Sequence, residues 1–135
     1  MTKAVLVRPS LKINKEESLG EEVQLKAHEL YNKLKKLLKK LEVELTMLES
    51  EKNGRFDAVE EADFLFVDTR DAEVLDRIDF EKSGKLKGIV FVDPTIEHIG
   101  RTAHINLPKL IIGSSRVALK DVERDVMKFF KKILG

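Results

Sequence analysis

Residues suited to holding a phosphate group stand near the carboxyl end of the chain. An apolar run is followed by Gly113, Ser114, Ser115 and Arg116, and a helical pattern comes next. Backbone N–H groups at the start of a helix attract anions, a glycine allows close approach, and hydroxyl and guanidinium groups donate hydrogen bonds. The spacing therefore predicts an anion site, although a serine at this position can equally cap the helix that follows.

Two carboxylates occupy similar positions after other apolar runs. Asp68 follows the run 64–67, and Asp93 follows the run 88–92. Two carboxylates at adjacent strand ends can hold Mg²⁺ through water and bridge it to a phosphate, so we predict Mg²⁺ as the metal here. The alternative is that each aspartate caps the next helix.

Further polar residues follow the predicted strands and complete the set of candidate ligand contacts. Ligands of a parallel sheet bind outside the carboxyl ends of its strands. The additional candidates selected by this rule are Arg8, Ser10, Thr69, Arg70 and Thr95. The chain carries neither a phosphate-loop lysine motif nor a dinucleotide glycine fingerprint, so the pattern names no nucleotide family and leaves open whether the protein is an enzyme.

A third candidate lies in the segment 95–104. Glu97, Arg101 and His104 are spaced four and three residues apart, which places them on one face of a helix. These three side-chain types together can do acid–base chemistry on an anionic substrate. The competing interpretation is an exposed stripe of ion pairs.

The elements that would position these residues follow from hydrophobic periodicity. Apolar runs predict strands, and spacings of three and four predict helices. The predicted strands cover 4–7, 64–67, 88–92 and 110–112, and the predicted helices cover 18–41, 56–61, 72–78, 95–104 and 117–134.

Residues 42–48 fit two structures. The leucines at 34, 38, 41, 45 and 48 continue a helical spacing, whereas Val43, Leu45 and Met47 alternate with polar residues as in a strand. We favour the strand, because it makes the chain a regular alternation of strands and helices. A continued helix would instead project as an arm suited to dimerisation.

Apolar strands that alternate with helices indicate a parallel sheet covered on both faces. The chain has 135 residues and no internal repeat or linker, so we predict a single α/β domain over 1–135. The expected architecture is a three-layer, doubly wound domain with a mainly parallel sheet of four or five strands, flavodoxin-like or Rossmann-like.

Composition narrows the class of protein further. The chain has no cysteine, which excludes disulfides, thiolate metal sites and cysteine nucleophiles. Abundant Lys and Glu with few Asn, Gln and Met is typical of thermophiles, and we expect a thermophilic source. There is no long apolar run for a membrane span and no signal-peptide core, so we expect a cytoplasmic protein.

Charge is distributed unevenly, although the formal net charge is only +1. Residues 42–81 carry 14 acidic and 4 basic side chains, and the segments on either side are basic. Two helices hold most of this positive charge, at Lys33, Lys35, Lys36, Lys39 and Lys40 and at Lys120, Arg124, Lys128, Lys131 and Lys132. In a flavodoxin-like winding these helices adjoin, and the shared face could bind nucleic-acid phosphates or simply be solvated.

Three functions remain open. The first is binding of a phosphorylated or nucleotide-like ligand at the strand carboxyl ends. The second is a non-catalytic homodimer that uses the leucine-rich first helix. The third is nucleic-acid binding through the two basic helices, which the interrupting glutamates and the lack of interleaved aromatic residues make less favoured.

Overall fold

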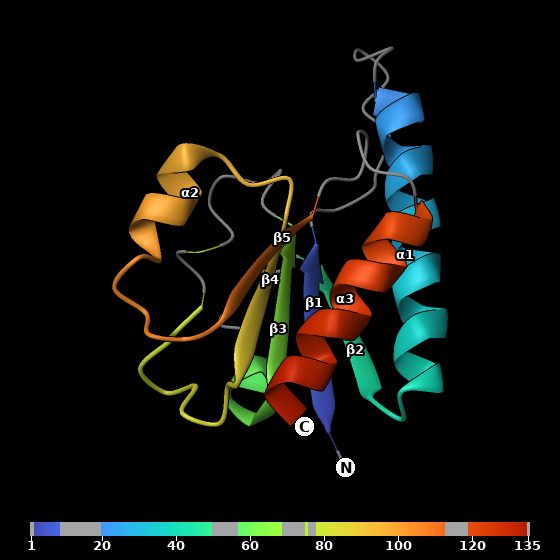
Figure 1. The fold of residues 1–135 in the computed structure, drawn as a ribbon. Helices are drawn as coiled ribbons and strands as arrows, with labels where there is room; N and C mark the ends of the chain where they lie inside the picture. The colour runs from blue at the N-terminus through green and yellow to red at the C-terminus, as the bar shows by residue number, and fades with distance from the viewer. Residues whose placement is uncertain are drawn as a thin grey trace.

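A five-stranded parallel sheet forms the centre of the molecule (Figure 1). The structure, a computed structural model, describes residues 2–8, 20–49, 57–68, 75, 78–112 and 119–134. The strands are β1 (Lys3–Arg8), β2 (Glu44–Glu49), β3 (Phe64–Asp68), β4 (Gly88–Val92) and β5 (Lys109–Ile112). Their order across the sheet is β2-β1-β3-β4-β5, and every neighbouring pair is parallel.

This strand order confirms the predicted doubly wound, flavodoxin-like or Rossmann-like α/β fold. The chain moves from β1 outward to β2 and then returns to the other side of β1 to form β3. The winding therefore reverses between β1 and β3, and proteins of this architecture usually bind ligands at the carboxyl ends of the two strands that flank such a reversal. The strand interpretation of residues 42–48 is also confirmed, since residues 44–48 form most of β2.

Two long helices cover one face of the sheet. They are α1 (Gly20–Lys40) and α3 (Leu119–Leu134), which lie side by side in Figure 1. Alternate strand residues point to this face, and Phe64 and Phe66 pack there against Phe130 at ring-centroid distances of 4.2 and 6.1 Å. Both faces of the central strands are buried, which explains why these strands read as unbroken apolar runs.

The opposite face is covered by shorter elements. The 3₁₀ helix η1 (Asp57–Glu61) contributes Val59, and residues between β3 and β4 contribute Leu75, Ile78 and Leu86. Most of the helix predicted over 72–78 lies outside the described residues, and Ile78 itself is not helical. The helix α2 (Ile96–Arg101) precedes β5 and is shorter than the predicted 95–104.

The end of α1 explains why the leucine spacing does not continue as helix. Glu42 adopts a left-handed backbone with φ of 59°. The N–H of Val43 donates to the carbonyl of Leu38 at 2.9 Å, and the N–H of Glu42 donates to the carbonyl of Lys39 at 3.1 Å. These paired bonds form a Schellman motif, which satisfies the last carbonyls of α1 and turns the chain into β2.

Four leucines in the second half of α1 belong to the core of this chain. Leu30, Leu34, Leu37 and Leu38 are all buried between the helix and the sheet. They are therefore not available as the surface of a dimer, and a homodimer, if formed, must use other residues. Within the part of the chain that the structure describes, no helix is long and apolar enough to cross a membrane.

Candidate functional site

Arg8 and Asp68 end the two strands between which the winding reverses. Val7 pairs with Val67 in the parallel register, so the next residue of each strand lies at the same level of the sheet. Side chains alternate along a strand, and Leu6 and Phe66 face α1. Arg8 and Asp68, each two residues later, therefore point to the same face.

Tyr31 reaches these strand ends from α1. It lies one residue after Leu30 on the buried side of the helix, and only 2% of its surface is exposed. Its hydroxyl donates a hydrogen bond to Oδ2 of Asp68, whose exposed fraction is 0%. Because a buried carboxylate is costly without polar partners, this bond compensates part of the cost of burying Asp68.

The guanidinium of Arg8 lies over the ring of Tyr31. Its Cζ is 5.4 Å from the ring centroid, within the range of a cation–π interaction. Arg8 is partly exposed at the strand end, whereas Tyr31 and Asp68 are buried beneath it. The result is a layered arrangement: Asp68 orients Tyr31, and the Tyr31 ring supports Arg8.

This arrangement is suited to binding rather than to proton transfer. An arginine keeps its charge at all ordinary pH values and presents planar donors that match carboxylate and phosphate oxygens. The aromatic support restricts where the guanidinium can lie, which lowers the entropy that a ligand contact must overcome. A guanidinium held in this way can donate hydrogen bonds to the oxygens of an anion.

Asp93 lies next to this site at the end of the neighbouring strand. Asp68 pairs with Val92 in the register between β3 and β4, so Asp93 comes one position later. Its φ of 52° turns the chain away from β4, and its N–H donates to the carbonyl of Ile112 at 2.9 Å. The part of the chain that the structure describes contains no group of three or more possible metal ligands, so a Mg²⁺ at Asp68 and Asp93 stays a prediction.

Thr95, predicted as a ligand contact, has a structural role at the start of α2. Its hydroxyl accepts from the N–H of His98 at 3.3 Å, and its own N–H donates to Nδ1 of His98 at 3.2 Å. These reciprocal bonds form a capping box at the start of α2. Thr95, and not Asp93, therefore caps this helix, and a ligand contact by Thr95 stays untested.

The predicted stripe of Glu97, Arg101 and His104 does not lie on one helix. The helix α2 ends at Arg101, and His104 lies in the turn that follows. The early end has a physical reason, because the Thr102 hydroxyl donates to the carbonyls of His98 and Ile99 and closes the last turn. The acid–base interpretation of this segment loses its geometric basis.

The remaining predicted ligand residues lie outside the described residues. They are Ser10, Thr69, Arg70, Gly113, Ser114, Ser115 and Arg116. The described candidates Arg8, Asp68 and Asp93 all fall at the ends of neighbouring strands, as the rule for parallel sheets requires.

Tyr31 is the residue of this site that the rule for strand ends does not select, because its position in the apolar register of a helix indicates only a core or interface residue. It is nevertheless the only tyrosine of the chain, on a helix face whose other apolar residues are aliphatic. A buried tyrosine hydroxyl requires a polar partner. That partner is 37 residues away along the chain, so the helix pattern alone could not name it.

Comparison with family models, with curated proteins and with solved structures finds no match to this chain. The function is therefore inferred from the residues at the strand ends and on the helices.

Proposed function

We propose that the protein binds a small phosphorylated or nucleotide-like anion at the carboxyl ends of β1 and β3, with Arg8 as a principal contact. One observation carries the proposal: Arg8 is held over the Tyr31 ring, and Tyr31 is in turn hydrogen-bonded to the buried Asp68. The strand ends where the winding reverses are the usual ligand site of this architecture.

The burial of Asp68 supports a role beyond stability. Replacing buried charged groups with apolar residues of similar size is often neutral or stabilising, so a strand end built only for packing does not need a carboxylate. Here the carboxylate of Asp68 orients Tyr31, and the Tyr31 ring supports the partly exposed guanidinium of Arg8. A guanidinium positioned in this way can bind a phosphate through two parallel hydrogen bonds.

The proposal extends to residues predicted from the sequence. Ser10 follows β1 closely, and the segment 113–116 follows β5, so both come after strands whose carboxyl ends lie at the same edge of the sheet. In the proposal, Ser114, Ser115 and Arg116 supply further donors to the anion, as do Thr69 and Arg70.

Mg²⁺ has a separate place in the proposal. Asp68 is fully buried and already accepts from Tyr31, whereas Asp93 is partly exposed. This favours Asp68 as the residue that orients Tyr31, and it favours Asp93 as the carboxylate that contacts a hydrated Mg²⁺ brought by the ligand phosphate. Mg²⁺ usually keeps several waters and binds through one or two carboxylates plus phosphate, which fits this division.

The chain provides its own reporter for a test. It contains one tyrosine and no tryptophan, so its intrinsic fluorescence comes from Tyr31 alone. Titration with inorganic phosphate and with sugar phosphates, with and without Mg²⁺, should change this emission as the anion binds Arg8. Nucleotides absorb in the same range, so their binding is followed by ligand-observed NMR.

Two arginine variants sharpen the result. Arg8→Gln should weaken binding of the best ligand at least tenfold, because a charge-assisted contact is lost. The matched control Arg101→Gln, on the exposed side of α2, should leave affinity unchanged. An Arg8→Gln protein that binds as tightly as wild type, or a wild type that binds no member of the panel at millimolar concentration, would contradict the proposal.

A further inference from the structure

The groove between α1 and α3 concentrates positive charge on a chain that is nearly neutral. Two hollows, of about 380 and 370 Å³, share Glu123 and together are named the α1/α3 groove. Among the described residues, the first hollow is lined by α1 together with Glu123 of α3, and the second is lined by α3. Their lining includes Lys33, Lys36, Lys39 and Lys40 from α1 and Arg124, Lys128 and Lys131 from α3. Because the net charge of the whole chain is +1, this face must be balanced by acidic surface elsewhere.

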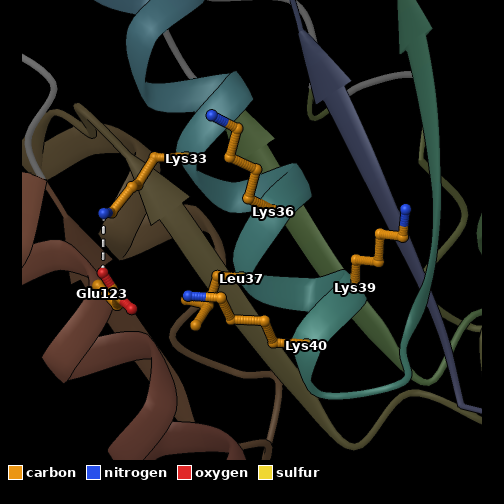
Figure 2. A pocket seen from close by; sticks show the side chains of 6 residues that line it. All are labelled: Lys33, Lys36, Leu37, Lys39, Lys40 and Glu123. Carbon is orange, nitrogen blue, oxygen red and sulfur yellow. Dashed lines mark ion pairs between the residues drawn. The ribbon is translucent and has the colours of Figure 1, made fainter.

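Among the described residues of this lining, Glu123 is the only carboxylate, and its charge is paired with a lysine. Its Oε2 lies 2.8 Å from Nζ of Lys33, as Figure 2 shows. The hydrogen bond and charge of Lys33, with a smaller contribution from the charge of Lys40, hold the pKa of Glu123 below its ordinary value of 4.5. Glu123 therefore stays ionised at neutral pH and offsets only the charge of Lys33.

Arg124 is likewise engaged within its own helix. Its guanidinium lies 3.5 Å from Asp121 and 3.3 Å from Asp125. The groove lysines that make no ion pair with any residue the structure describes are Lys36, Lys39, Lys40, Lys128 and Lys131. Figure 2 shows Lys40 extending toward α3, whereas Lys39 points away from the seam.

The groove is formed by the middle and last turns of the two helices. It therefore has no backbone N–H donors of the kind that cradle a single phosphate at a helix start. A small anion would gain only one or two exposed ammonium contacts here. A linear polyanion can contact Lys36, Lys40, Lys128 and Lys131 together and release several counterions, which is the usual origin of tight polyanion binding.

The apolar part of the lining distinguishes among polyanions. Of the described residues in the lining, only Leu37 and Met127 contribute apolar side chains, and Leu37 is almost fully buried. An acidic polypeptide needs apolar or aromatic anchors for affinity, and a nucleic-acid single strand needs aromatic rings on which bases stack. No aromatic side chain is found among the described residues that line either hollow.

We infer that the α1/α3 groove binds the phosphodiester backbone of a nucleic-acid double helix through Lys36, Lys40, Lys128 and Lys131. The contact is electrostatic and independent of base sequence. Duplex DNA and duplex RNA share the backbone chemistry that the lysines recognise. This surface is separate from the anion site at Arg8, so an experiment can contradict one of the two proposals and leave the other intact.

The test measures the affinity for a short DNA duplex and for an RNA duplex of the same sequence, by fluorescence anisotropy of the labelled nucleic acid. Four neutralised phosphates on B-DNA give a slope of log affinity against log salt of about −3.6, which is a roughly 150-fold loss between 50 and 200 mM salt. Binding of either duplex with this steep dependence of affinity on salt concentration supports the proposal. The duplex that binds more tightly shows whether DNA or RNA is the preferred ligand.

A matched pair of variants locates the contact. Lys40→Gln with Lys128→Gln removes two groove charges, and should lower affinity at least tenfold and reduce the slope to about −1.8. The control, Lys35→Gln with Lys132→Gln, removes the same charge from exposed positions on the same helices that line neither hollow, and should keep the wild-type slope. Arg8→Gln should also leave duplex binding unchanged.

Four results would overturn the inference. They are equal loss in the control and groove variants, a slope near zero, displacement of the duplex by polyglutamate at equal charge concentration, and a single strand that binds as tightly as the duplex. Equal loss in the two variants would show that affinity follows net charge alone. Each of the other three results would show that the groove does not recognise the backbone of a duplex.

Discussion

Replacing Tyr31 with phenylalanine tests the link between α1 and the strand ends. The change removes one oxygen and keeps the ring, so it opens no large cavity and preserves the surface beneath the Arg8 guanidinium. The hydroxyl is buried and donates to a carboxylate that is fully buried. Hydrogen bonds to charged groups contribute roughly 1.5–3 kcal/mol, so Tyr31→Phe should lower the free energy of unfolding by about 2 kcal/mol.

A second background separates the charge of Asp68 from the hydrogen bond. Asp68→Asn keeps an oxygen that can accept from Tyr31 but removes the negative charge. A neutral hydrogen bond contributes about 1 kcal/mol, so Tyr31→Phe should cost about 1 kcal/mol in this background. The double-mutant cycle should therefore give a coupling energy of about 1 kcal/mol between Tyr31 and Asp68.

Urea unfolding followed by far-UV circular dichroism is the assay, because the phenylalanine variant has no tyrosine signal. The dependence on urea should be the same in all four proteins, since the surface exposed on unfolding hardly changes. A cost of Tyr31→Phe below about 0.5 kcal/mol would refute the view that this bond compensates the burial of Asp68. Equal costs in both backgrounds would show that the charge of Asp68 has no part in it.

Three further predictions concern the helices. Leu34→Ala should cost about 3–5 kcal/mol in urea unfolding, because Leu34 is buried in the core, and a loss below about 1 kcal/mol would contradict that burial. Glu42→Gly should raise the free energy of unfolding by about 1 kcal/mol by relieving the left-handed backbone at φ of 59°, and a lower urea midpoint would show that no strain is present. The pKa of Glu123 is lowered by Lys33, so the ionised form stabilises the folded chain above about pH 4.5, and this contribution is lost as the pH falls through the lowered value. Glu123→Gln should therefore show a smaller loss of stability on acidification than wild type in urea midpoints measured across this range, and an identical loss would exclude the ion pair as its source.

The central strands of the sheet were predictable because a strand that is buried on both faces must be apolar at every position. Phe64 to Val67 and Gly88 to Val92 form apolar runs, and both are strands. The end of α1 was ambiguous because the leucine spacing continues past Lys40 into β2. The left-handed backbone of Glu42 ends the helix. Glycine or asparagine usually occupies this position, so a glutamate here does not predict the end of a helix.

The site was predictable to the extent that it follows from topology. Arg8 and Asp68 were selected because they follow apolar runs, and parallel strands place such residues at one edge. Tyr31 could not be selected in this way, since its contact with Asp68 depends on the height and rotation of α1 over the sheet. Thr95 was selected for the same reason as Arg8, but its hydroxyl is used to start α2.

The helix α1 carries both proposed surfaces, on different sides and at neighbouring positions. Tyr31 points inward and is hydrogen-bonded to the end of β3, and Lys33, two residues later, points outward and forms an ion pair with α3. These two contacts therefore fix the rotation of one helix against both the sheet and its neighbouring helix. A rotation that moved Tyr31 away from Asp68 would also move Lys33 from Glu123, because the backbone of a helix turns as a unit. The buried Leu34 and Leu38 oppose such a rotation, so the anion site and the basic groove depend on the same packed core even though their ligand contacts are separate.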